Sequence, residues 1–238
     1  MDSNNKKLLG ILGGLGPLSS AYFYELVTKH TLAKCDQDHI DIILSSYAST
    51  PDRTDYILGK SERSPVPSMV ASAKLLEKSG VDAIVIPCNT AHYFIEEVRK
   101  SVNVPVPSII EETVLHLKTF DMRKPLILAT EGTIQTETYQ SCLTKHGIDF
   151  SIPSENDQRI ISSSIYDGVK TGDLSVASDV ASVANSYAKF GCDCAILGCT
   201  ELSVLKPQLE GKMEVVDSME CLANTVIKMF GKQTVGLF

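Results

Sequence analysis

Two of the seven cysteines, Cys88 and Cys199, stand at matching places in the sequence. Each lies eight residues after a glycine, Gly80 or Gly191, and each glycine opens a Gly-x-Asp turn that leads into an apolar, strand-like run. The residue numbers of the two copies differ by 111, close to half the chain. This near-repeat predicts two similar lobes, each with a cysteine just after one of its strands.

A pair of thiols on opposite walls of one cleft could take a proton from one face of a carbon and return a proton to the other face. A single base cannot easily reach both faces, so one group would start as thiolate and the other as thiol. Free cysteine is often no more than a buried packing residue, but the matched positions favour a functional pair. The remaining cysteines have no such placement and are interpreted as structural: Cys35, Cys142, Cys192, Cys194 and Cys221.

Other chemistry is less well supported. Three sulfurs cluster within Cys192–Cys199, but structural zinc usually takes four ligands from loops, and this span is mostly an apolar strand, so no metal site is expected. Cys88 and His92 could form a nucleophile–base pair on a helix, although that scheme leaves Cys199 unexplained. The turn Gly13–Gly16 does not have the G-x-G-x-x-G spacing of a dinucleotide site.

Short apolar runs alternate with stretches of helical periodicity, which is typical of parallel sheets covered by helices. Strands are expected at 8–12, 41–46, 83–86, 104–107, 125–129, 194–197 and 214–216, and helices at about 19–33, 68–79, 95–101, 135–146, 157–170, 175–190 and 217–230.

The predicted fold is therefore α/β, with two doubly wound lobes related by a pseudo-two-fold axis and the site between them. The lobes are expected to comprise residues 1–114 plus 218–238, with Cys88, and residues 115–217, with Cys199. Ligands of open α/β sheets bind outside the carboxyl ends of the strands, where both cysteines fall. Helix N-termini there would add N–H groups that stabilise a thiolate or a carboxylate.

The bulk composition narrows the class of protein. Hydrophobic residues make up 43% and charged residues 21%, which excludes a disordered chain, and the formal charge of −7 argues against a nucleic-acid or anionic-membrane partner. No apolar run approaches the roughly 18 residues of a membrane span. An odd number of cysteines and no recognisable export signal predict reduced thiols in a cytoplasmic protein.

Several separated motifs occur in an order that resembles the aspartate/glutamate racemase family, most closely its aspartate racemase branch, along almost the whole chain. These motifs are Gly13–Pro17, Pro51–Thr54, Tyr56–Gly59, Pro87–His92, Ile110–Thr113, Ala129–Thr133, Gly168–Lys170 and Gly198–Glu201. The resemblance implies racemisation without pyridoxal phosphate or any other cofactor, in a two-lobed homodimer whose substrate is a small acidic amino acid.

The resemblance also assigns roles to individual residues. Cys88 and Cys199 fall on the family's catalytic cysteines, and Arg53 and Lys170 fall on positions that bind substrate carboxylates in aspartate racemases. The loops that cradle the amino acid contribute Asn89, Thr90, Thr130 and Thr200. A supporting layer is expected at Leu15, which replaces a family methionine, and at His92, Thr133 and Glu201.

Two departures from the glutamate racemase branch favour aspartate as the substrate. The first glycine-rich turn has no aspartate, and Glu201 stands where that branch has histidine. A broad-specificity or glutamate-accepting racemase of the same family is the alternative. Maleate isomerases also use two cysteines, whereas arylmalonate decarboxylases use one and fit the pair less well. A non-catalytic amino-acid-binding protein is the alternative from another class.

Overall fold

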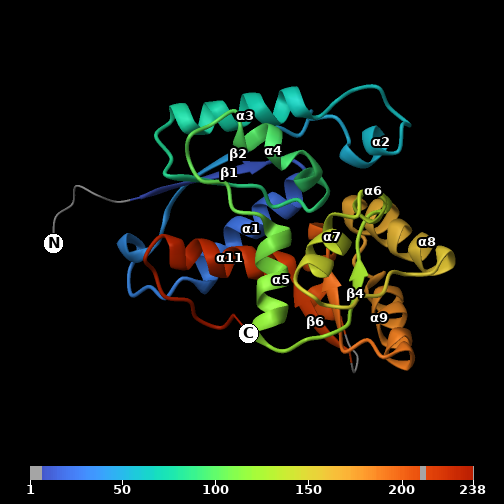
Figure 1. Cartoon of the computed structure of the whole chain (residues 1–238). Helices are drawn as coiled ribbons and strands as arrows, with labels where there is room; N and C mark the ends of the chain where they lie inside the picture. The colour runs from blue at the N-terminus through green and yellow to red at the C-terminus, as the bar shows by residue number, and fades with distance from the viewer. Residues whose placement is uncertain (1–6, 210–212, 238) are drawn as a thin grey trace.

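Each half of the chain forms a parallel sheet covered by helices (Figure 1). The computed structural model describes residues 7–209 and 213–237. The first sheet has the order β2-β1-β3 and the second has the order β4-β5-β6. The strands are β1 (Leu8–Gly13), β2 (Asp41–Ser46), β3 (Ala83–Val85), β4 (Pro125–Leu128), β5 (Cys194–Leu197) and β6 (Glu214–Asp217). The expected α/β class with two lobes is confirmed.

The strand expected at 104–107 does not form, because two prolines in this segment, Pro105 and Pro107, have no N–H to give to a ladder. Its backbone still runs beside β3, since the Ile84 N–H donates to the Pro105 carbonyl at 3.0 Å. In the second lobe, Ser151 forms an isolated parallel bridge with Leu126 of β4. If the segments around Pro105 and Ser151 are counted as short strands, each lobe arranges its four segments in the same spatial order. The second segment along the chain lies at one edge, followed by the first, the third and the fourth.

The Gly-x-Asp turn does the same structural work in both copies of the near-repeat. Each glycine turns the chain with a positive φ, +83° and +82°, which L-residues with a side chain rarely adopt. Two residues later, Asp82 accepts a hydrogen bond from the Leu8 N–H at 2.6 Å, and Asp193 accepts one from the Arg123 N–H at 2.6 Å. Each aspartate therefore ties the start of its own strand to the start of the neighbouring one.

The helices of the first half and the chain end are α1 (Pro17–His30), α2 (Arg53–Ile57), α3 (Val66–Lys78), α4 (Ile95–Arg99), α5 (Ile109–Thr119) and α11 (Ser218–Met229). Those of the second half are α6 (Glu131–Gln135), α7 (Thr138–Lys145), α8 (Glu155–Ser163), α9 (Ala177–Ser186) and α10 (Thr200–Leu205). Short turns complete the fold: η1 (Asp36–Asp38), η2 (Thr90–Phe94), η3 (Ser164–Gly168), η4 (Val169–Thr171), η5 (Tyr187–Phe190) and η6 (Lys206–Gln208).

Three predicted helices differ from the structure. The helix expected at 135–146 is two helices, because Glu137 between them is left-handed, with φ of +53°. The helix expected at 157–170 ends at Ser163 and continues as the π-helical turn η3 and the 3₁₀ turn η4. The helix expected at 175–190 begins at Ala177 and tightens into η5. The helices α2 and α5 were not expected.

A single core joins the two lobes. Residues of β1, such as Leu9 and Ile11, belong to the same buried cluster as Ile127 of β4, Ile196 of β5 and Val216 of β6. The helices α1, α5 and α11 lie between the two sheets and supply much of this cluster (Figure 1). The last helix, α11, packs against α1 and α5. The residue boundaries of the two lobes stay a prediction.

Among residues 7–209 and 213–237, no helix is long and apolar enough to cross a membrane.

Candidate active site

Cys88 and Cys199 line the same small cavity between the lobes. Cys88 lies three residues beyond the end of β3, and Cys199 is the N-cap of α10, just after β5. Both side chains are buried, at 5% exposure each. The cavity is lined by Leu15, Asp52, Arg53, Thr54, Cys88, Asn89, Thr90, Thr130, Tyr166, Lys170, Cys199, Thr200 and Glu201. The matched strand ends therefore bring both thiols into one place.

The cavity has a volume of about 10 Å³, which is room for about one water molecule. A larger hollow of about 510 Å³ adjoins it, and the two share Asp52, Arg53, Lys170 and Glu201 as lining residues. An amino acid is larger than the cavity, so it can enter only if some of these walls move.

The electrostatic surroundings of the two thiols differ. The Cys199 thiol donates a hydrogen bond to Glu201 Oε2 at 3.0 Å, and burial together with this carboxylate raises the pKa of Cys199 well above its usual value. Burial also raises the pKa of Cys88, but the guanidinium of Arg53 opposes that rise. Cys88 is therefore the thiol that ionises more easily, and Cys199 is the one held as a proton donor.

Arg53 is buried at the start of α2 and faces Cys88. Its Nη2 donates to the Leu15 carbonyl at 2.8 Å and its Nη1 donates to the Pro51 carbonyl at 3.2 Å. Interactions with Cys88, Asp52 and Glu201 outweigh burial and keep the pKa of Arg53 above its usual value, so the charge persists.

Two residues that line this cavity each have a buried polar atom with no hydrogen-bond partner within the described chain. These are Arg53 Nε and Thr200 Oγ1. Buried polar groups are normally satisfied, so two such atoms in residues that line one cavity are suited to binding a polar ligand. A carboxylate would match the N–H donor of Arg53, because guanidinium groups bind carboxylates with charge-assisted hydrogen bonds.

Three threonine hydroxyls join the lobes at the cavity. Thr90 Oγ1 lies 2.9 Å from Thr130 Oγ1 and 2.9 Å from Thr133 Oγ1, and the latter two are 3.0 Å apart. Thr130 also caps α6, because its Oγ1 accepts from the Thr133 N–H at 3.2 Å. Thr90 and Thr130 line the cavity, whereas Thr133 lies behind them and fixes their orientation.

Asn89 is held by side chains from two other elements, α11 and α7. Its Nδ2 donates to Ser218 Oγ at 3.0 Å, and its Oδ1 accepts from the Tyr139 hydroxyl at 2.7 Å. Ser218 in turn donates to the Leu197 carbonyl at 2.7 Å. These bonds fix the loop that follows Cys88 against α11 and the end of β5.

His92 supports the backbone at Cys88 and does not face either thiol. Its Nε2 accepts a hydrogen bond from the Ile109 N–H at 3.0 Å, so its Nδ1 carries the proton and donates to the Cys88 carbonyl at 2.8 Å. Burial lowers the pKa of His92 to about 4, so the ring is neutral. Both nitrogens are occupied by backbone groups, so the alternative of a Cys88–His92 nucleophile–base pair is wrong.

Lys170 reaches the cavity from η4 and is held between two groups. Its ammonium lies 3.8 Å from Asp52 Oδ2 in the other lobe and 4.2 Å from the centre of the Tyr166 ring. The ion pair and the cation–π contact place the charge at the mouth of the cavity.

Three cavity residues were not among the sequence-based candidates: Asp52, Thr54 and Tyr166. Asp52 and Thr54 flank Arg53, and Tyr166 precedes Lys170 by one helical turn, so proximity to those two candidates was the available signal. Of the sequence-based candidates, His92 and Thr133 do not line the cavity and the other ten do.

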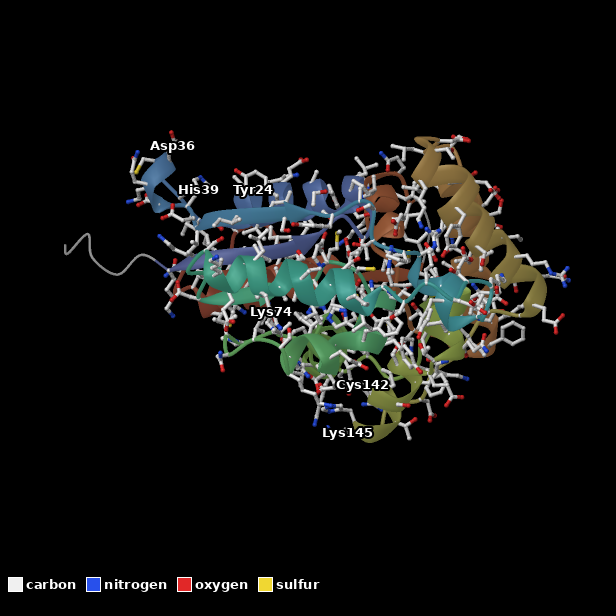
Figure 2. The ribbon with its side chains drawn as sticks, turned by 90° about the horizontal axis from the view of Figure 1, so that it is seen from above. Tyr24, Asp36, His39, Lys74, Cys142 and Lys145 are labelled. Atoms are coloured by element: carbon white, nitrogen blue, oxygen red, sulfur yellow. The ribbon has the colours of Figure 1, made fainter. Side chains whose placement is uncertain are left out.

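The other five cysteines do not line this cavity. Cys192, Cys194 and Cys221 are buried, Cys35 is exposed, and Cys142 lies half-buried on α7 (Figure 2). In the part of the chain that the structure describes, no three His, Cys, Asp or Glu side chains are arranged to hold a metal ion.

The fold and the site define a class of protein, namely α/β proteins with two parallel sheets and a polar cavity between two lobes. The profile of the Asp/Glu/hydantoin racemase family matches residues 12–226, and the chain belongs to this family. Family membership agrees with the expected class of enzyme, an isomerase of the racemase type.

Individual relatives differ in their substrates. The aspartate racemase of Picrophilus torridus superposes with a TM-score of 0.86 at 32% identity, over 96% of both chains. The broad-specificity amino-acid racemase RacX of Bacillus subtilis is 28% identical over 227 residues, which is 94% of this chain and 98% of RacX. A glutamate racemase of Aquifex pyrophilus is 32% identical over 70% of this chain and 66% of its own length.

Proposed function

We propose that this chain is a cofactor-independent racemase that interconverts L- and D-aspartate by proton transfer at Cys88 and Cys199. The observation that carries the proposal is the position of the two thiols on one cavity. Arg53 opposes the rise in the pKa of Cys88, whereas Glu201 adds to the rise in the pKa of Cys199. Both pKa values are raised, but Cys88 is the thiol of the pair that ionises more easily to act as the base, and Cys199 is the one that keeps its proton and acts as the acid.

The reaction balances within this pair. The Cys88 thiolate takes the Cα proton, so the C–H bond breaks, an S–H bond forms, and the electron pair stays on the substrate as an enolate. Cys199 then gives its proton to the opposite face of the carbon, which forms the new C–H bond and leaves Cys199 as thiolate. The reverse reaction starts from that state, so the enzyme returns to its original protonation after one turnover in each direction.

The charge of the enolate must be stabilised by the protein itself. Thr200 Oγ1, which lacks a partner, and N–H groups of the loops after the cysteines are suited to the α-carboxylate as its charge grows. Arg53 and Lys170 are suited to the side-chain carboxylate, because both are cations on the cavity wall. Asn89, Thr90 and Thr130 complete the cradle around the amino group and carboxylate.

The experiment is racemisation of L-aspartate in deuterium oxide, followed by chiral chromatography and mass spectrometry. We expect D-aspartate with deuterium at Cα, and we expect Cys88→Ala and Cys199→Ala each to lose about 10²–10⁴-fold in rate while they keep the wild-type circular dichroism. Full turnover in either variant would refute the two-base scheme. Binding of aspartate without Cα exchange would identify a non-catalytic amino-acid-binding protein.

A second candidate is a racemase that accepts several amino acids, and the similarity to RacX over nearly its whole length favours testing it. Aspartate and glutamate differ by one methylene, which a pocket discriminates by only about 10–200-fold. Turnover of a panel of L-amino acids therefore separates the aspartate, glutamate and broad-specificity alternatives. We further propose that the enzyme is a cytoplasmic homodimer, which sedimentation analysis and cell fractionation would check.

A further inference from the structure

Tyr166 stands between the catalytic cavity and a second hollow on the surface of the second lobe. This outer hollow has a volume of about 590 Å³ and is lined by Glu131, Glu155, Gln158, Arg159, Ser162, Ser163, Tyr166 and Asp167. Among the described residues that line the two spaces, Tyr166 is the one that they share. Tyr166 therefore lies at the boundary between them, and its side chain is referred to below as the wall.

The wall is fixed from several sides. Tyr166 lies on the π-helical turn η3, a rare geometry that is frequent at functional sites. The Lys170 ammonium lies 4.2 Å from the centre of the Tyr166 ring. The Tyr166 hydroxyl interacts with the Thr54 side chain of α2 in the other lobe. Burial raises its pKa, and the nearby Asp52 and Cys199 raise it further, so the hydroxyl stays neutral beside the reacting thiol.

The two spaces have different charges. On the catalytic side, Arg53 and Lys170 favour an anionic side chain. On the outer side, three carboxylates face one guanidinium, and the Arg159 guanidinium pairs with Glu155 at 3.6 Å. Of the other two carboxylates, Asp167 accepts from Ser163 at 3.0 Å, and Glu131 lies 3.9 Å from the exposed Lys60 ammonium.

We propose that Tyr166 is the specificity-determining residue of this site, because its ring limits the substrate to short acidic side chains. This inference rests on the proposed racemase function. Removal of the ring joins the cavity to the outer hollow, which provides space for a side chain several atoms longer than that of aspartate. The acidic lining of that hollow then favours a cationic side chain over an anionic one of equal length.

The experiment compares kcat/KM for L-aspartate, L-lysine and L-2-aminoadipate in the wild type and in Tyr166→Ala. We expect the wild type to prefer aspartate, and we expect Tyr166→Ala to raise the lysine-to-aspartate ratio at least about tenfold, with lysine ahead of 2-aminoadipate. Tyr166→Phe keeps the ring and should keep the wild-type ratio. Tyr24→Ala, which removes an exposed tyrosine from α1 (Figure 2), is the matched control and should also keep it.

The outcomes separate the two proposals. If the wild type racemises aspartate and neither Tyr166→Ala nor Tyr166→Leu changes the ratio, the role of Tyr166 is refuted and the proposed function stands. The Leu variant covers the case in which the Ala variant does not fold. Efficient racemisation of lysine by the wild type would also refute the claim that Tyr166 limits the substrate to short acidic side chains. A wild type that exchanges the Cα proton of no amino acid refutes the proposed function, and the specificity role with it.

Discussion

The Cys199 thiol donates a hydrogen bond to the carboxylate of Glu201, two residues later on α10, at 3.0 Å. Cys199 is a candidate catalytic group, and Glu201 lines the same cavity. The carboxylate stabilises the protonated thiol and disfavours the thiolate, which is the physical cause of part of the raised pKa of Cys199.

Glu201→Gln should lower the pKa of Cys199. The substitution keeps the size of the side chain and removes the negative charge, so the thiolate becomes easier to form, although burial still holds the pKa above its usual value. The measurement is the pH dependence of alkylation of the Cys199 peptide, followed by mass spectrometry. The midpoint should move to lower pH in Glu201→Gln and stay in place in Glu97→Gln on the exposed face of α4. An unchanged midpoint would contradict the coupling.

Arg53→Lys should lower kcat/KM for aspartate by about 10–100-fold, because a hydrogen bond to a charged group contributes about 1.5–3 kcal/mol and lysine cannot reproduce the planar fork. The charge is kept, so the pKa of Cys88 should change little. Steady-state kinetics with both enantiomers provide the measurement, and Arg63→Lys in an exposed loop is the control. Wild-type kcat/KM in Arg53→Lys would show that the guanidinium does not bind substrate.

His92→Ala should destabilise the protein by about 2–4 kcal/mol at pH 7, because it leaves the buried Cys88 carbonyl and Ile109 N–H without partners. Urea unfolding measures this loss. A destabilisation below 0.5 kcal/mol, roughly the effect of a surface substitution, would mean that these two bonds are dispensable.

The same histidine should make stability depend on pH. Its folded pKa is about 4, below the usual 6.5, so the unfolded state binds a proton first as the pH falls. The stability of the wild type should therefore be fully present above pH 6.5 and decline toward pH 4, by up to about 3 kcal/mol. Asp217, whose pKa is raised to about 6, acts in the opposite direction over pH 6 to 4. The difference between wild type and His92→Ala at each pH isolates the histidine and should shrink as the pH falls.

Gly132→Ala should push the lobes apart at the cavity. A Cβ at this position would lie 3.0 Å from Thr54 Oγ1 and 3.1 Å from Thr54 Cα, where α6 meets α2. Overpacking of this kind costs about 1–3 kcal/mol, so both the free energy of unfolding and kcat/KM should fall. Urea unfolding and kinetics measure the effect, with Ser141→Ala on the exposed face of α7 as the control. Wild-type stability together with wild-type kinetics would mean that this contact is loose.

The sequence predicted the elements whose signal is local. The Gly-x-Asp turns and apolar runs located β3 and β5, and the matched cysteines located the cavity. The strand expected at 104–107 does not form because its two prolines lack the N–H groups that a sheet requires, even though its valines favour a strand. Asp52, Thr54 and Tyr166 were missed because they reach the cavity through α2 and a π-helical turn, which have no periodic pattern of their own.

His92 shows a different kind of limit. A histidine four residues after a cysteine suggests a catalytic pair on one helix, but this segment is the 3₁₀ turn η2, and the ring points to the backbone of Cys88 and Ile109 instead. The free N–H group at the N-terminus of α5, a helix without a clear signal in the sequence, decides the orientation of the ring.

The core that β1, β4, β5 and β6 share has a mechanical consequence. The two lobes share one hydrophobic core through α1, α5 and α11. They therefore cannot move apart as rigid bodies without exposing apolar surface to water. We therefore expect a substrate to enter through movement of the outer segments, α2 in one lobe and η3 with η4 in the other. These segments meet at the ion pair between Asp52 and Lys170. The shared core would then keep the two sulfurs at a constant separation during any movement of those outer segments.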